Sequence, residues 1–116
     1  MREKVFIAGQ EGMVGSAIYK LLKKKKFNII NCSRKNLDLT NQEKVDNWFK
    51  KNKPSVVVNA AGRVGGILDN STFLSDYIYI NTMIGMNIIN SSLNHGVKKL
   101  INLGSACIYP RTVKQP

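Results

Sequence analysis

Residues 4–15 read Lys-Val-Phe-Ile-Ala-Gly-Gln-Glu-Gly-Met-Val-Gly. An apolar run from Val5 to Ala8 passes directly into glycines at 9, 12 and 15, and an amphipathic segment follows. This order predicts a strand, a tight turn and a helix whose free N–H groups face the turn. In such a unit the first glycine permits the turn, the second admits a pyrophosphate and the third lets the helix pack closely. We therefore expect a dinucleotide-binding turn rather than a glycine-rich turn without a ligand.

Strands and helices alternate along the rest of the chain. We expect strands at 5–8, 27–32, 55–59 and 98–103, helices at 13–25, 42–51 and from Ser75 or Asp76 to 94, and a loop at 62–71. Thr40 or Asn41 is the expected N-cap of the second helix. This alternation predicts an α/β fold, a Rossmann-type doubly wound parallel sheet with right-handed crossovers. The expected order of its first four strands is 3-2-1-4.

In that order the fourth strand would form an apolar edge, which proteins normally cover. We therefore expect residues 1–116 to be the N-terminal part of an NAD(P)-binding Rossmann domain. The rest of that domain and a substrate domain would lie outside these residues.

The composition narrows the functional class. The chain has 116 residues and a formal net charge of +11, with lysine runs at the expected ends of two helices. Lysines there favour the helix dipole and are usually solvated, so we expect no nucleic-acid partner. No segment is long and apolar enough for a membrane span, and no secretion signal is recognised, so we expect a cytoplasmic protein. Cys32 and Cys107 form no disulfide framework or metal motif, and His95 falls at a helix C-terminus.

The residue pair after the second strand predicts the cofactor. Dinucleotide folds that prefer NAD place Asp or Glu there for the ribose 2′-hydroxyl, whereas this chain has Ser33-Arg34. A guanidinium fits a 2′-phosphate, so NADP(H) is favoured. Glu11 opposes this interpretation if its side chain points inward. Asp38 either accepts a hydrogen bond from adenine or forms a turn.

The ends of the third and fourth strands carry further candidates. Small residues at 60–62 let backbone line the nucleotide site, and Asn81, in mid-helix, is expected to brace the central strands. After the fourth strand comes Gly-Ser-Ala-Cys at 104–107. The Ser105 hydroxyl can hydrogen-bond a substrate carbonyl or alcohol, and the Cys107 thiol is either an acid/base or an inert group.

Three stretches together resemble the GDP-L-fucose synthases, a family of extended short-chain dehydrogenase/reductases. They are Val-Phe-Ile-Ala-Gly-x-x-Gly-Met-Val-Gly-Ser-Ala-Ile at 5–18, Val-Gly-Gly-Ile at 64–67 and Leu-Gly-Ser-x-Cys-Ile-Tyr-Pro at 103–110, with Lys-Gln-Pro at 114–116. The glycine spacing is shared by many relatives, but the other two stretches are much more specific.

The resemblance implies an enzyme that epimerises a GDP-4-keto-6-deoxy-D-mannose at C3 and C5 and reduces C4 with NADPH, giving GDP-L-fucose. Ser105 then corresponds to the serine that binds the C4 oxygen, and Cys107 to the epimerisation acid/base. The resemblance also implies a homodimer formed through the long helix. The family's Tyr-x-x-x-Lys and partner histidine are expected to be absent here, so these residues alone should not turn over.

The full set of candidate residues combines both lines of reasoning. The expected cofactor-binding residues are Gly9, Gln10, Glu11, Gly12, Met13, Val14, Gly15, Arg34, Asp38, Leu39, Ala60, Ala61, Leu103, Gly104, Ser105 and Ala106. The expected catalytic residues are Ser105 and Cys107, and no metal is expected. The alternatives are another nucleotide-sugar epimerase, dehydratase or reductase, or a non-catalytic dinucleotide-binding module.

Overall fold

The computed structural model describes residues 3–114. Its elements are β1 (Lys4–Ala8), α1 (Met13–Lys24), β2 (Asn28–Ile30), α2 (Gln42–Asn52), β3 (Val56–Asn59), α3 (Ile67–Thr72), α4 (Leu74–Asn94), β4 (Lys99–Asn102) and the 3-10 turn η1 (Ala106–Ile108). The expected strands and long helices are therefore present, with ends that differ by a few residues. Gln115 and Pro116, part of the stretch used in the resemblance, lie outside the described residues.

The four strands form one parallel sheet in the order β2-β1-β3-β4. In the centre, Val5 of β1 lies opposite Val56 of β3, and Ala8 lies opposite Asn59. The α/β doubly wound class is confirmed, but the expected order 3-2-1-4 is wrong. β3 pairs with β1 because its valine run is buried on both faces, whereas the three-residue β2 is half exposed and forms the edge.

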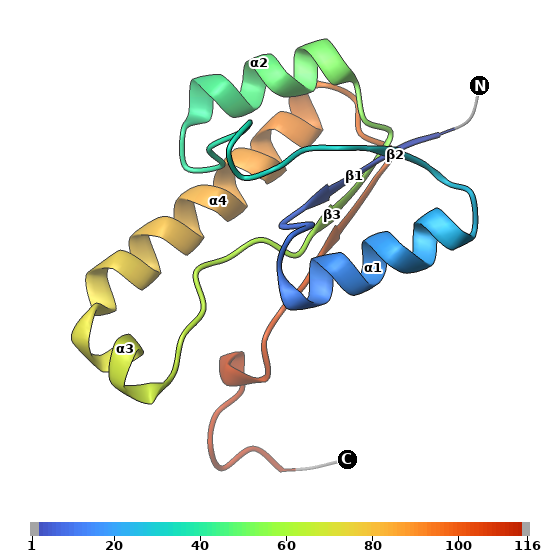
Figure 1. The fold of residues 1–116 in the computed structure, drawn as a ribbon. Helices are drawn as coiled ribbons and strands as arrows, with labels where there is room; N and C mark the ends of the chain where they lie inside the picture. The colour runs from blue at the N-terminus through green and yellow to red at the C-terminus, as the bar shows by residue number, and fades with distance from the viewer. Residues whose placement is uncertain (1–2, 115–116) are drawn as a thin grey trace.

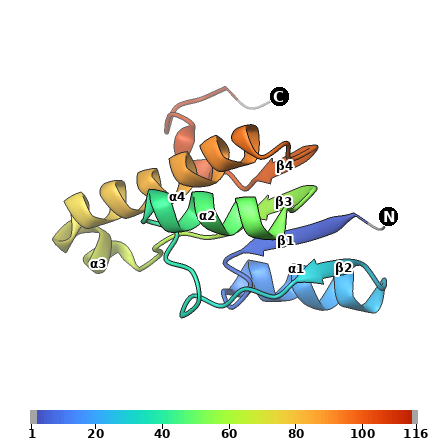
Figure 2. The same cartoon turned by 90° about the horizontal axis from the view of Figure 1, so that it is seen from above.

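The strand order also decides where the helices lie. The connection from β1 to β2 runs one way across the sheet, and the connection from β2 to β3 runs back past β1. Because such crossovers are right-handed, α1 lies on one face and α2 lies on the other with α4 (Figures 1 and 2). Successive strands are therefore added in one direction from β1 to β2 and in the opposite direction from β3 to β4. This reversal point lies between β1 and β3, a position where α/β folds bind ligands.

The main core fills the space between the sheet and the α2–α4 layer. Phe6 of β1 packs against Trp48 and Phe49 of α2, with ring centroids 4.3 and 5.8 Å away. Ile84 and Ile88 of α4 complete this cluster from the neighbouring helix. The inner face of α4 therefore forms part of the main core.

Local contacts mark the start of α2 and the end of α4. The Asn41 side chain accepts the Lys44 N–H at 2.9 Å, so Asn41 rather than Thr40 caps α2. His95 follows the last residue of α4, and its Nε2 lies 2.7 Å from Asp46 Oδ1 of α2. The expected loop at 62–71 is partly wrong, because residues 67–72 form the short helix α3.

The first turn rests on close backbone packing that only glycine permits. Gly9 has a φ of +79°, and a Cβ built there would lie 2.7 Å from the Ala60 oxygen. A Cβ at Gly15, at the start of α1, would lie 2.6 Å from the Gly9 carbonyl carbon. The backbones of β1, α1 and the end of β3 therefore contact one another directly. An added side chain would meet these backbone atoms, which cannot move aside as a flexible side chain could.

Replacing Gly15 with alanine should lower the free energy of unfolding by about 2–3 kcal/mol, because the new methyl group meets backbone rather than a movable side chain. Urea denaturation measures this loss. Gly85→Ala is the matched control, since nothing lies within 4 Å of its added Cβ in the middle of α4. The control should raise stability by about 0.5–1 kcal/mol. Equal effects of the two substitutions would contradict the close-packing account.

Candidate functional site

A cavity of about 820 Å³ opens at the carboxyl ends of β1, β2 and β3. Its volume lies in the range of small-molecule and cofactor sites. Among the expected cofactor residues, those that line it are Gly9, Gln10, Glu11, Gly12, Arg34, Asp38, Leu39, Ala60 and Ala61. The wall is completed by residues from β1, the β2–α2 segment, the segment after β3 and α4. The topology thus brings together nearly all of the candidates from the first three strand ends.

The glycine turn forms the floor of this cavity, and it fits a dinucleotide. The Gly12 N–H donates to the Gly9 oxygen at 3.0 Å, which closes the turn. No side chain at 9 or 12 fills the space above the start of α1. The Gln10 Oε1 is buried without a hydrogen-bond partner among the described residues. A cradle that side chains would fill, at the start of a helix, is suited to a bound anionic group.

The glycine turn contacts the segment that follows β2. Glu11 Oε2 accepts the backbone N–H of Arg34 at 3.2 Å, so the glycine turn and the β2 end are joined across the cavity. Cys32 is buried nearby, and burial, with the Glu11 charge as a second cause, raises the pKa of its thiol. Cys32 is therefore an uncharged wall of the cavity.

Asp38 forms a turn at the next part of the wall. Its Oδ1 accepts both the hydroxyl of Thr40 at 2.7 Å and the Thr40 N–H at 3.0 Å. These hydrogen bonds, the hydroxyl one first, lower the pKa of Asp38. The Leu39 carbonyl accepts from the Asn87 side chain of α4 at 2.9 Å. Asp38 thus stabilises a turn, as one of its two expected roles required. The hydrogen bond from Asn87 of α4 holds the segment that carries Leu39 in place.

The segment after β3 is tied both to the sheet and to α4. The Asn59 side chain donates to Asn102 Oδ1 of β4 at 2.8 Å and accepts the Ala61 N–H at 3.2 Å. Asn81 accepts the Arg63 N–H at 2.7 Å and donates to the Arg63 oxygen at 3.0 Å. Asn81 therefore has a bracing role, although it braces this segment rather than the central strands.

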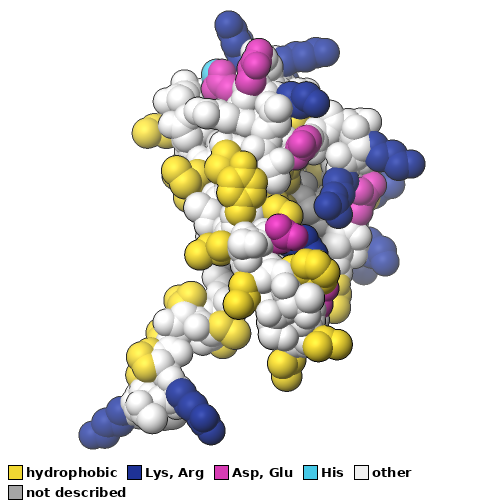
Figure 3. Space-filling view, turned by 90° about the vertical axis from the view of Figure 1, so that its left-hand side faces the viewer, with side chains coloured by type: hydrophobic (Ala, Val, Ile, Leu, Met, Phe, Trp, Pro, Cys, Tyr) yellow, Lys and Arg dark blue, Asp and Glu magenta, His cyan; other side chains and the backbone are white. Residues whose placement is uncertain are grey.

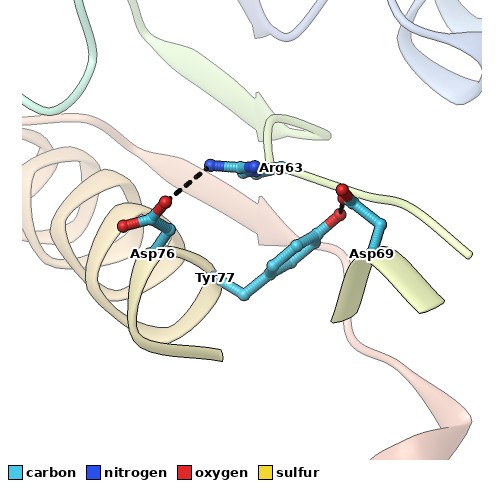
Figure 4. A network of polar contacts seen from close by, with 4 residues as sticks. All are labelled: Arg63, Asp69, Asp76 and Tyr77. Carbon is cyan, nitrogen blue, oxygen red and sulfur yellow. Dashed lines mark hydrogen bonds and ion pairs between the residues drawn. The ribbon is translucent and has the colours of Figure 1, made fainter. Parts of the chain in front are cut away.

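Side-chain contacts hold the same segment farther out (Figure 4). The Arg63 guanidinium lies 3.4 Å from Asp76 and packs over the rings of Tyr77 and Phe73, at 4.9 and 5.4 Å from their centroids. The Tyr77 hydroxyl donates to Asp69 of α3, and this bond is the main cause that raises the pKa of Tyr77. This Arg63 cluster fastens α3 and the cavity wall to the first turns of α4.

The remaining candidates lie outside the lining of the cavity. Gly15 packs under the turn, while Met13 and Val14 are exposed on α1. The stretch after β4, comprising Leu103, Gly104, Ser105, Ala106 and Cys107, is exposed. The Ser105 Oγ accepts the Cys107 N–H at 3.2 Å and caps η1. The roles expected for these residues stay predictions.

One tyrosine does precede a lysine by four residues, contrary to the expected absence of Tyr-x-x-x-Lys. Tyr19 and Lys23 lie on α1, where the Lys23 ammonium is 5.7 Å from the Tyr19 ring centroid. The Tyr19 hydroxyl donates to Asn31 Oδ1 at 3.1 Å. Neither residue lines the cavity, so this spacing supplies no proton donor to the site.

Between residues 3 and 114, no group of three or more His, Cys, Asp or Glu side chains could hold a metal ion. Over the same residues, no helix combines the length and apolar character that crossing a membrane requires.

Sequence reasoning missed the contributions of Asn87 and the Arg63 cluster. Asn87 is buried on the inner face of α4. A buried asparagine in an otherwise apolar helix face was a signal, because such a group must find a hydrogen-bond partner. Arg63 followed a strand end in the same way as Arg34, but no rule links such a residue to a helix that begins a dozen residues later.

Replacing Asn81 with alanine should free the backbone at Arg63 and accelerate tryptic cleavage there by about ten-fold. The two lost hydrogen bonds correspond to about 1–2 kcal/mol of local stability. Rates of cleavage after Arg63, followed by mass spectrometry, measure the effect. Asn90→Ala is the control, because Asn90 is exposed on the same helix. Unchanged cleavage in the Asn81 variant would mean that the segment is held by the Arg63 cluster alone.

Comparisons with known proteins agree with this geometry. The family described as "NAD dependent epimerase/dehydratase family" matches residues 5–116. A GDP-L-fucose synthase of Sinorhizobium fredii is 46% identical over 114 residues, which cover 98% of this chain and 36% of that protein. GDP-L-fucose synthase 1 of Arabidopsis thaliana is also 46% identical over 114 residues, covering 97% of this chain and 35% of that protein.

A solved structure has a fold that is similar to that of this chain. The GDP-mannoheptose C4 reductase from Campylobacter jejuni with NADP bound superposes with a TM-score of 0.93 and 39% identity, covering 99% of this chain and 34% of that one. The chain thus spans about a third of the length of these relatives. The resemblance to GDP-L-fucose synthases is confirmed, and the chain belongs to the NAD-dependent epimerase/dehydratase family.

Proposed function

We propose that this chain forms the NADP(H)-binding part of a GDP-L-fucose synthase-type epimerase-reductase. The cavity at the reversal point between β1 and β3 is the observation that carries the proposal, because a glycine turn, a helix N-terminus and Arg34 meet there. The Campylobacter jejuni relative has NADP bound, and the Sinorhizobium fredii and Arabidopsis relatives are GDP-L-fucose synthases. A cytoplasmic location is part of this proposal.

Each wall of the cavity would hold one part of the cofactor. The backbone at Gly9 to Gly12 and the first turn of α1 would hold the pyrophosphate, where N–H groups and the helix dipole favour negative charge. Arg34 would pair with the ribose 2′-phosphate, and the segment carrying Leu39 would cover the adenine. When bound, the reduced nicotinamide supplies the hydride for reduction of the C4 ketone.

Two residues after β4 are proposed to act on the GDP-sugar. The Ser105 hydroxyl would hydrogen-bond the C4 oxygen and withdraw electron density from the adjoining carbons. The Cys107 sulfur, acting as the base, would then take a proton from a carbon beside the ketone. The partner histidine that the resemblance implies would donate a proton to the opposite face of that carbon, which completes the epimerisation. Its exposure leaves Cys107 accessible to a substrate of this size.

A GDP-sugar C4 reductase that does not epimerise is the second candidate. Its support is the 39% identity to the Campylobacter jejuni C4 reductase, which is close to the similarity shared with the GDP-L-fucose synthases. A dinucleotide-binding module without catalysis is the third, and it would bind the cofactor without acting on any GDP-sugar. Product analysis by NMR, which detects inversion at C3 and C5, separates the first two functions.

We also propose a homodimer formed through α4. Its inner face is buried in the core, yet its outer face carries a second set of apolar side chains along the 21-residue helix. Figure 3 looks onto the side of the molecule that includes this helix and shows hydrophobic groups exposed there. The exposed apolar residues of α4 are Leu74, Ile78, Tyr79, Met86, Ile89 and Leu93. A helix that exposes a row of large apolar side chains opposite a buried face is normally covered on both sides, and a second copy would cover this one.

Arg34→Gln should weaken NADPH binding by roughly ten- to a hundred-fold, because a charge-assisted pair with the 2′-phosphate is lost. NADH binding should change little. Fluorescence titration of the protein expressed from its complete natural gene gives both dissociation constants. Lys35→Gln is the matched control, since Lys35 carries the same charge at the next position but does not line the cavity. Wild-type protein that binds neither nucleotide would refute the proposed function.

Ile89→Lys should dissociate the dimer, weakening association by roughly a hundred-fold, because a charge would be buried without a partner. Analytical ultracentrifugation at micromolar concentration measures the change. Leu21→Lys is the control, because Leu21 is similarly exposed, at 54% against 51%, but lies on α1. A wild-type protein that sediments as a monomer would refute the α4 interface.

A further inference from the structure

The Glu11 carboxylate occupies a specific place in the cavity. Glu11 lies in the glycine turn, between Gly9 and Gly12, and its Oε2 accepts the Arg34 backbone N–H at 3.2 Å. The carboxylate is thereby held at the carboxyl end of β2. Dinucleotide folds recognise the 2′ position of the adenosine ribose at this strand end. The Glu11 carboxylate, which comes from the glycine turn, therefore lies where other dinucleotide folds place an acidic residue at the end of β2.

The surroundings of this carboxylate leave its charge without an ion-pair partner. Among residues 3–114, the ion pairs are Arg63–Asp76, His95–Asp46 and Lys98–Glu3, so the Arg34 guanidinium is not paired with Glu11. The hydrogen bond to the carboxylate comes from the uncharged backbone N–H of Arg34. A carboxylate and a guanidinium that are not paired with each other thus line the same cavity.

The two forms of the cofactor meet these groups differently. A 2′-phosphate carries about two negative charges near neutral pH, so Arg34 attracts it and Glu11 repels it. A 2′-hydroxyl is uncharged and can donate a hydrogen bond to a carboxylate, as it does at sites that prefer NAD. The site therefore contains Arg34, which favours NADP(H), and Glu11, which favours NAD(H).

We infer that Glu11 is a specificity-determining residue that lowers the preference for NADP(H) and lets the protein bind NAD(H) with similar affinity. This inference rests on the proposed cofactor-binding function and deepens it. Arg34 favours the phosphate, Glu11 favours the hydroxyl, and the ratio of the two affinities follows from their balance.

Glu11→Gln tests this balance directly. The amide oxygen can still accept the Arg34 N–H, so the turn keeps its hydrogen bond while the charge is removed. We expect the ratio of NADPH to NADH affinity to rise by about ten-fold, mostly through tighter NADPH binding. Glu11→Lys should raise the ratio further, because it adds an attraction for the phosphate. Titration calorimetry with each nucleotide, on the protein expressed from its complete natural gene, provides the affinities without depending on turnover.

The control and the outcomes separate this inference from the proposed function. Glu3→Gln removes the same charge at the amino end of β1, away from the cavity, and should leave the ratio unchanged. If the wild type binds NADPH but neither Glu11 variant changes the ratio, Glu11 does not determine specificity and the inference fails. A wild type that already binds NADPH a hundred-fold more tightly than NADH also overturns it. If the wild type binds neither nucleotide, the proposed function fails and the inference falls with it.

Discussion

The structure depends on the close approach of backbone at Gly9, where the end of β1, the start of α1 and the end of β3 meet. A side chain at Gly9 would collide with Ala60, and one at Gly15 would collide with Gly9 itself. This packing fixes the direction in which α1 leaves the sheet, and hence where its N-terminus points. The cavity lies beside this junction because β2 and β3 are the two neighbours of β1, and the segments that follow them form its walls. The same glycine constraint thus determines the fold and the position of the site.

The sequence predicted the elements because their signals are local. The glycine turn, the Asn41 cap and the valine run of β3 each act over a few residues, and each appears in the structure at its expected place. The strand order was predicted wrongly because it is a global property. Burial offered a usable signal, however. A short strand that begins with asparagine suits an edge, and three consecutive valines suit the centre, which excludes β3 as an outer strand.

The candidate site was predictable where residues follow strand ends, and less so where helices reach across. The glycine turn, Arg34 and the alanines after β3 line the cavity, because α/β folds bind ligands at the carboxyl ends of their strands. The hydrogen bond from Asn87 to Leu39 and the contacts of Arg63 join residues that tertiary packing alone brings together. The direction of the Glu11 side chain was also beyond sequence reasoning. The turn places its Cα, but only the position of the β2 end supplies the N–H that holds its carboxylate.

Helix α4 links the site to the surface of the molecule. Its inner face holds two separate parts of the cavity wall, through Asn87 to Leu39 and through Asn81 to Arg63. Its outer face carries the apolar residues proposed to pair with a second copy. Because a helix moves as a rigid rod over this length, a displacement of the outer face would shift both wall segments together. Burying that face in a dimer would restrict such displacement. Order in the cofactor site and association of the chains would then be stabilised by the same element.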